Sequence, residues 1–246
     1  MKKLFVVCVV LLSAFSLQLQ AQNKQENTLG YFNSLSIGIN AGTTGWGIDV
    51  ATPIGQYLSL RAGVTFMPNF TISDDVDVDV DFEGYHGSHS IDVEGGIKRT
   101  SGEILLNFYP FKRSSFFITG GAAFGGDKII KLKGHSDELA GYSGLAGIEI
   151  GDYLIPVDKN GNVSGGIKVA SFRPYVGIGF GRIVPKNKRV GFLFEIGAQI
   201  HGTPEVYTDY GNVDMLMEEA DNEFTDVMDK ITVYPVMRFR LCGKLF

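Results

Sequence analysis

The chain has 246 residues, with 22 Lys and Arg against 27 Asp and Glu, so its formal charge is −5. An acidic chain is a poor candidate for sequence-independent nucleic-acid binding, which depends on basic groups that face phosphate. The high content of glycine and aromatic residues, with 32 Gly, 18 Phe and 10 Tyr, favours many short strands joined by turns.

Residues 1–21 are predicted to be a signal peptide. Lys2 and Lys3 precede an apolar run that starts at Leu4, and Ala21 is a suitable small residue for cleavage. The run is short for a membrane helix, which needs about 20 apolar residues, although an uncleaved anchor helix is the alternative. Cleavage would leave Cys242 as the only cysteine, so no intrachain disulfide is expected. We then expect a short periplasmic segment at 22–33 and a single domain at 34–246.

Eight segments of the predicted domain alternate between apolar residues and polar or small ones. In chain order they are 34–42, 46–54, 58–67, 102–110, 116–124, 172–182, 190–200 and 231–246. Period-2 alternation indicates β-strands with two different faces, and each segment has about the 9–11 residues of a tilted membrane-spanning strand. The seventh is the clearest, because Phe192, Phe194 and Ile196 oppose Gly191 and Glu195.

The two faces of these strands differ in kind. One carries aliphatic residues and Phe, and the other carries Gly, small polar residues and charges of both signs. The charges are Asp49, Arg61, Glu103, Arg173, Glu195, Arg238 and Arg240. A glycine-rich face suits the narrow interior of an eight-stranded barrel, and mixed charges can pair when buried. We therefore predict a lumen charge network. The alternative is a secreted soluble lipocalin-like barrel or β-sandwich, with the apolar face inside.

The predicted connections alternate between short and long. Short ones fall near 55–56, 111–113 and 185–188, and long ones cover 68–100, 126–171 and 201–230. Short periplasmic turns and longer extracellular loops are typical of outer-membrane barrels. Charge follows the same division, because the loops at 68–100 and 201–230 are acidic. The short turns are basic, with Lys112, Arg113, Lys186, Lys188 and Arg189.

These features together resemble the small eight-stranded outer-membrane barrels of OmpA/OmpX type, over essentially the whole mature sequence. The resemblance implies an all-β, eight-stranded antiparallel transmembrane up-and-down barrel in the bacterial outer membrane, without a periplasmic domain. One departure concerns the last residue, because such barrels usually end on a lipid-facing aromatic. Phe239 and Leu241 are in phase with Leu245, which leaves Phe246 out of phase. A bulge would restore the phase; otherwise the register of the last strand differs.

An acidic run lies in the 68–100 loop. Strand alternation would place its acids on one face, and these are Asp75, Asp77, Asp79 and Asp81. Clustered carboxylates bind calcium, but the run lacks the spacing of an EF-hand. The alternative is a solvated strand that projects above the membrane.

Two other loop segments show local patterns. Asn160-Gly161, between Tyr153–Val157 and Val163–Ala170, predicts a surface hairpin. Apolar residues at helical spacing in 213–230 predict an amphipathic helix with Asn212 as its N-cap. Such a helix would lie on the barrel rim, engage a partner, or simply pack within its loop.

All four histidines fall in predicted extracellular loops, with serines and an acid nearby. They are His86, His89, His135 and His201, close to Ser88, Ser90, Ser136 and Asp137. Some small barrels are lipid-modifying enzymes that use Ser, His and an acid at the outer rim. A triad needs hydrogen-bond geometry between distant residues, and sequence proximity is the only signal here. Solvated histidines are the alternative.

We expect a non-enzymatic protein with no cofactor and a structural, binding or adhesion role at the cell surface. The loops make up a large part of the chain, and function concentrates in loops on rigid scaffolds. Expected partners are outer-membrane lipid and lipopolysaccharide, with an extracellular protein or other surface ligand also open, and no nucleic acid. The alternatives are a lipid-modifying enzyme or a small porin-like pore, although a lumen packed by ion pairs should conduct little.

Overall fold

The computed structural model describes residues 29–82, 85–137, 140, 147–150, 153–186, 188–210, 214–215 and 223–245. Within these ranges, residues 72–92, 147–150, 214–215 and 223–225 are described by their backbone alone. The predicted signal peptide and Phe246 lie outside the described residues.

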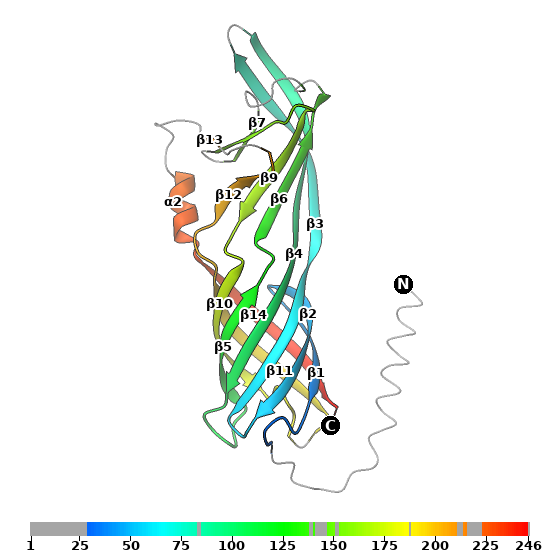
Figure 1. The fold of residues 1–246 in the computed structure, drawn as a ribbon, viewed down its shortest axis with the longest axis vertical. Helices are drawn as coiled ribbons and strands as arrows, with labels where there is room; N and C mark the ends of the chain where they lie inside the picture. The colour runs from blue at the N-terminus through cyan, green and yellow to red at the C-terminus, as the bar shows by residue number, and fades with distance from the viewer. Residues whose placement is uncertain are drawn as a thin grey trace, which may run out of the picture.

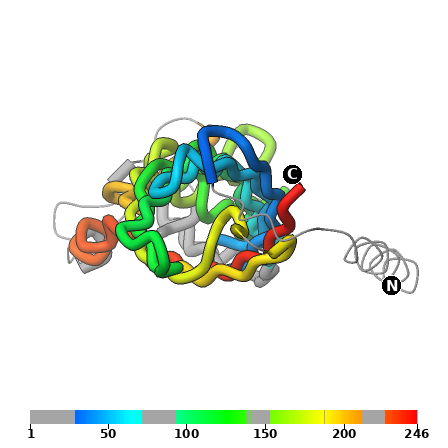
Figure 2. The backbone as a smooth tube through the Cα atoms, turned by 90° about the horizontal axis from the view of Figure 1, so that it is seen from below, coloured from blue at the N-terminus to red at the C-terminus, as the bar shows by residue number. Residues whose placement is uncertain are grey.

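Eight antiparallel strands form a closed up-and-down barrel (Figures 1 and 2). They are β1 (Ser36–Gly42), β2 (Gly45–Ile54), β3 (Leu58–Phe82), β4 (Tyr85–Phe108), β5 (Phe116–Phe124), β10 (Phe172–Gly181), β11 (Val190–Ile200) and β14 (Val233–Lys244). Each pairs with the next in this order, and β14 closes the ring by pairing with β1. The predicted fold is confirmed, and closure leaves the barrel itself without an unpaired strand edge.

The apolar face of every barrel strand points outward. Ile39, Phe180 and Phe192 are about 60% exposed, whereas Arg61 and Glu195 are fully buried. Side chains alternate between the two faces of a strand. When the apolar faces point outward, the polar side chains of all eight strands therefore point into the lumen. The alternative of a soluble barrel with Phe192 at its centre is therefore wrong.

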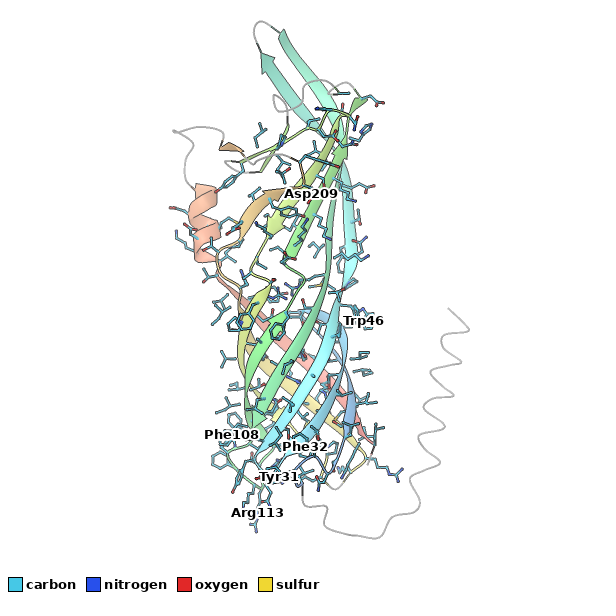
Figure 3. The ribbon with its side chains drawn as sticks, viewed as in Figure 1. Tyr31, Phe32, Trp46, Phe108, Arg113 and Asp209 are labelled. Carbon is cyan, nitrogen blue, oxygen red and sulfur yellow. The ribbon has the colours of Figure 1, made fainter. Side chains whose placement is uncertain are left out.

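Exposed aromatic side chains mark both ends of this apolar belt. Trp46 lies at the end nearer the long loops, and Tyr31, Phe32 and Phe108 lie near the short turns (Figure 3). Aromatic girdles at these two levels are typical of barrels whose outer surface meets bilayer hydrocarbon. Among the described residues, no helix is long and apolar enough to cross a membrane.

The strands β3 and β4 continue far beyond the barrel, which corrects the expectation that 68–100 is a loop (Figure 1). A register shift between Met67 and Phe70 separates the barrel part of β3 from the extension. In this extension β4 pairs with β6 (Lys128–His135) in place of β5. β6 pairs in turn with β9 (Asn162–Lys168), and β9 pairs with β12 (Glu205–Thr208). The change occurs where β5 ends, because the freed edge of β4 needs new hydrogen-bond partners.

A second, three-stranded sheet contains β7 (Gly147–Ile150), β8 (Tyr153–Pro156) and β13 (Asp214–Met215). The predicted turn exists, since Asp158 accepts hydrogen bonds from the backbone amides of Asn160 and Asn162, both at 2.8 Å. The predicted hairpin is wrong, however, because β8 pairs with β7 and β13 whereas β9 pairs with β6 and β12.

The helix predicted for 213–230 is shorter than expected. It covers α2 (Glu223–Lys230), and Asp214–Met215 forms strand β13 instead. Asn212, the predicted N-cap, lies outside the described residues. Pairing of β13 with β8 outweighs the helical periodicity of this part of the segment.

The last strand keeps one register along its whole length. β14 pairs with β11 and β1 without a shift, so no bulge changes its phase. Phe239, Leu241 and Leu245 point outward, and Arg238 and Arg240 point inward. The predicted phase of these residues is confirmed.

We expect Ile39→Arg to destabilise the barrel by about 2–4 kcal/mol, because a charge near the middle of a lipid-facing surface loses its hydration. Ile39 pairs with Ile48 and Leu241 at the centre of β1. The measurement is urea unfolding of protein folded into phospholipid vesicles. Val227→Arg is the matched control, since Val227 is similarly exposed but lies on α2. Equal, small losses for both variants would show that the belt does not contact hydrocarbon.

Candidate functional site

Two arginine–carboxylate pairs cross the lumen between opposite walls of the barrel. Arg61 of β3 donates to Glu195 of β11, with the shorter Nη2–Oε2 distance at 2.8 Å. Arg238 of β14 makes a two-pronged contact with Glu103 of β4, with the shorter distance at 2.7 Å. Arg238 also lies 3.5 Å from Glu195, its register neighbour. The four side chains therefore brace the barrel across its diameter.

A third pair links β14 to β2. Arg240 binds Asp49 through Nε and Nη2, at distances of 2.5–3.0 Å, and Asn40 donates to the same carboxylate at 3.1 Å. Strand β1 lies between β14 and β2, and its Gly38 faces the guanidinium. A Cβ atom at Gly38 would approach Arg240 Nε to 2.3 Å, so a larger residue there would displace the guanidinium from its position beside Asp49.

Six of the seven charges predicted for the lumen are thus brought together, as three arginines and three carboxylates. The hydroxyl of Tyr175 joins them by donating to Glu195 at 2.7 Å. Arg173 is separate. Its guanidinium donates to Ser101 Oγ at 2.8 Å and to the carbonyls of Gly125 and Ala170 at 2.6 and 3.0 Å. Within the described part of the chain it forms no ion pair, because carbonyl groups of the nearby turn surround it.

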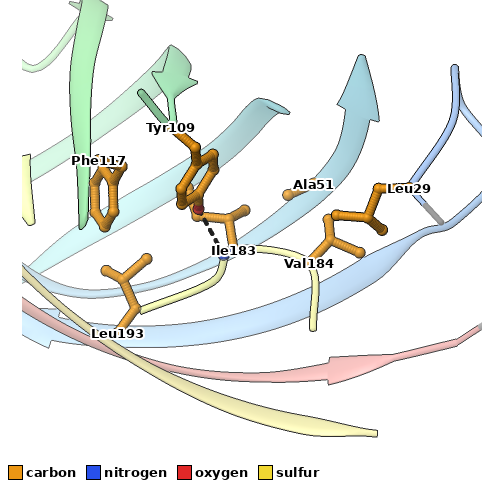
Figure 4. Close-up of a cluster of buried hydrophobic side chains, with 7 residues drawn as sticks. All are labelled: Leu29, Ala51, Tyr109, Phe117, Ile183, Val184 and Leu193. Atoms are coloured by element: carbon orange, nitrogen blue, oxygen red, sulfur yellow. Dashed lines mark hydrogen bonds between the residues drawn. The ribbon is translucent and has the colours of Figure 1, made fainter. Parts of the chain in front are cut away.

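The end of the lumen near the short turns is closed by an apolar cluster (Figure 4). The turn between β10 and β11 folds into the barrel, where Ile183 and Val184 are buried. They lie among side chains from other strands and from the segment that precedes β1, namely Leu29, Ala51, Tyr109, Phe117 and Leu193. We call this group the inner plug. Sequence reasoning treated the segment as an ordinary turn, although Ile183-Val184-Pro185 is an apolar exception within a basic stretch.

Hydrogen bonds join the inner plug to the charge network. The backbone amide of Ile183 donates to the Tyr109 hydroxyl at 2.9 Å. Its carbonyl accepts from Ser36 Oγ at 2.8 Å and from Arg240 Nη1 at 2.9 Å. Arg240 therefore holds both Asp49 and the inward turn, so the charged layer and the apolar layer stabilise each other.

Only some of the predicted loop residues can be located. Asp75, Asp77, Asp79 and Asp81 lie on one face of β3, opposite Asp92, Ser90, Ser88 and His86 of β4. The side chains of 72–92, His89 included, lie outside the description, so the calcium site stays a prediction.

The other two histidines have no serine partner in the described part of the chain. His135 contacts Asp137 and Asn162, at 3.2 and 2.9 Å, and His201 is buried beyond the end of β11. Ser136, which follows His135 in the chain, is buried. Among the described serines, none has a hydroxyl hydrogen-bonded to the ring of His135 or His201.

We call β6, β9 and β12, with the parts of β3 and β4 beyond the barrel, the extended sheet. The sequence analysis missed a polar cluster on its outer face. Lys128 of β6 lies 2.8 Å from Asp209 and 4.3 Å from the ring centre of Tyr207. Ser164 of β9 donates to the second oxygen of Asp209 at 2.7 Å. Hydrogen bonds from Lys128 and Ser164 hold the pKa of Asp209 below its usual value. These groups join β6, β9 and the end of β12, and thereby stiffen the sheet.

We expect Glu195→Gln to cost about 3–5 kcal/mol in the free energy of unfolding. The substitution leaves Arg61 without a compensating charge in a buried site. Glu205→Gln is the matched control, because the Lys168–Glu205 pair is largely exposed and such pairs contribute about 0–1 kcal/mol. Urea titration of both variants in vesicles measures the difference. A loss below about 1 kcal/mol for Glu195→Gln would contradict the structural role of the brace.

Comparison with known proteins gives a fold and no sequence family. No family model matches the chain, and no curated protein sequence matches it. Two solved structures, of CarO2 and CarO from Acinetobacter baumannii, align with a TM-score of 0.50 each. Their identities are 18% and 19%, over 86% and 87% of this chain and 98% and 99% of theirs. The chain therefore shares the eight-stranded barrel fold of these two proteins along nearly their whole length.

Proposed function

We propose that the chain is a bacterial outer-membrane barrel with a closed lumen and a non-enzymatic structural or binding role at the cell surface. In this assignment the short turns lie in the periplasm and the extended sheet lies outside the cell. The proposal also places the chain with the small barrels of OmpA/OmpX type. The observation that carries it is the filled interior, where three buried ion pairs lie above an apolar plug.

A filled lumen favours an anchor over a transport route. An eight-stranded barrel has an interior that side chains can just fill, and here Arg61, Arg240, Phe117 and Ile183 are wholly buried within it. Any route through the barrel would have to break ion pairs in a poorly hydrated site, at a cost of several kcal/mol. The barrel thus supplies a rigid base for what it carries outside.

The part of the molecule available for binding is the extended sheet. Strands β4, β6, β9 and β12 rise from the barrel beside the projecting β3–β4 hairpin (Figure 1). Lys131 and Lys133 of β6 are exposed on the same face as Asp209. A mixed charged surface just above the membrane suits contact with lipopolysaccharide, whose phosphates attract bases and whose bridging cations attract acids.

We expect the full-length protein to give no large, stable single-channel currents in planar bilayers, because the braces and the inner plug fill the lumen. The double variant Ile183→Gly/Val184→Gly, which removes the apolar side chains of the plug, should raise conductance. Lys131→Gln/Lys133→Gln, outside the barrel, should not. Large steady currents from the unmodified protein would overturn the closed-lumen proposal.

Surface labelling tests the orientation. In intact cells, Lys133→Cys should react with a maleimide–polyethylene glycol too large to pass the outer membrane. Lys112→Cys, in the turn between β4 and β5, should react only after the membrane is opened. The native Cys242 is buried and should contribute little background. Labelling of Lys112→Cys but not Lys133→Cys in intact cells would reverse the proposed topology.

A further inference from the structure

The described short turns, together with the segment that precedes β1, contain bases and no acidic side chains. Residues 29–35, 55–57, 109–115 and 182–189 contain no Asp or Glu. Their six bases are Lys112, Arg113, Arg182, Lys186, Lys188 and Arg189. In a chain with a net negative charge, this separation of charge calls for a physical reason.

The fold concentrates these bases further. The turns that contain them join β4 to β5 and β10 to β11, and β5 pairs with β10, so the two turns are neighbours. Arg182 Nη2 and Lys186 Nζ both donate to the carbonyl of Lys112, at 3.0 and 3.1 Å. We call Lys112, Arg113, Arg182, Lys186 and Lys188 the basic patch. None of its members forms an ion pair with a carboxylate in the described residues.

Like charges held this close repel one another. Partial burial, together with the nearby charges of Arg182 and Lys112, lowers the pKa of Lys186. The guanidinium of Arg182 lies 4.2 Å from the ring centre of Tyr109, and Lys112 Nζ lies 5.6 Å from that of Tyr57. Arg182 also donates to the carbonyls of Phe111 and Ser114. These contacts position the bases, and no carboxylate among the described residues pairs with them, so an anion that binds the patch would relieve the repulsion.

The level of the patch indicates where the anion comes from. Figure 3 shows Arg113 at the same end of the barrel as the labelled aromatic residues Tyr31, Phe32 and Phe108. Phe111, in the same turn as Arg113, is also exposed. Aromatic residues of this kind lie at the headgroup level of a bilayer, so the bases reach the layer that contains lipid phosphates.

We propose that the basic patch binds the phosphates of anionic phospholipids in the periplasmic leaflet. This inference rests on the proposed membrane placement and goes beyond it by naming the lipid class and the residues that select it. Guanidinium and ammonium groups from two turns provide several donors to one headgroup, and the exposed aromatics beside them contact the start of the acyl chains. Lipid is favoured over a soluble polyanion because the exposed apolar side chain of Phe111 directly precedes Lys112 and Arg113 in the same turn.

The test measures lipid retained by full-length protein. The protein is placed in nanodiscs that contain equal amounts of phosphatidylcholine and cardiolipin. It is then released, and native mass spectrometry identifies the lipids that stay bound to it. Lys112→Gln/Arg113→Gln removes two exposed charges without removing the Lys112 carbonyl that Arg182 and Lys186 use. We expect cardiolipin retention to fall roughly fivefold for each base removed. Lys159→Gln/Lys230→Gln removes two exposed charges outside the barrel, at the turn before β9 and on α2, and should retain cardiolipin like the unmodified protein.

Two results would overturn the inference. Equal cardiolipin retention by all three proteins would show that the patch does not select lipid. Loss of binding to soluble peptidoglycan fragments in Lys112→Gln/Arg113→Gln, with lipid retention unchanged, would assign the patch to a periplasmic polymer. Failure of the orientation assay described above is a separate outcome, because lipid selection can be measured in nanodiscs whichever side the patch faces in cells.

Discussion

Buried charge must be compensated, and the rest of this structure depends on that constraint. An eight-stranded ring leaves an interior so narrow that a charged side chain on one wall meets the opposite wall. Arg61 reaches Glu195 and Arg238 reaches Glu103 across this space. Each pair fixes the position of two strands that are far apart in the ring. A buried charge without its partner costs several kcal/mol of folding free energy. The strand register, the closure of the barrel and the filling of its lumen therefore depend on one another.

The inner plug extends the same logic to the end of the barrel. A turn that folds inward brings backbone polar groups into an apolar space, and these need partners. Arg240 provides one by donating to the Ile183 carbonyl while it holds Asp49. The guanidinium therefore belongs to both layers. This dual use explains why an apolar turn can enter a lumen whose middle is charged.

Outside the apolar belt the two ends of the molecule differ in construction. The short-turn end is compact and basic, and the other end continues as a sheet in which β6, β9 and β12 extend the edge of β4. The CarO structures from Acinetobacter baumannii share the fold at 18–19% identity. Fold similarity at this level assigns an architecture, and function has to be argued from the site. Both ends carry exposed charged side chains, whereas the outer surface of the barrel wall is apolar.

The sequence by itself determined the strands of the barrel, which of their faces points outward, and the set of charges inside. Period-2 alternation is a local pattern, and closing the ring turns the same face of every strand inward. Only the tertiary structure decided which charges pair, since Arg173 has the same pattern as Arg61 yet lies among carbonyl groups. It also decided that β8 and β9 separate, that Asp214–Met215 joins a sheet, and that Ile183 turns inward. These outcomes depend on partners distant in sequence, and local pattern carries no information about which distant edge or cavity a segment will meet.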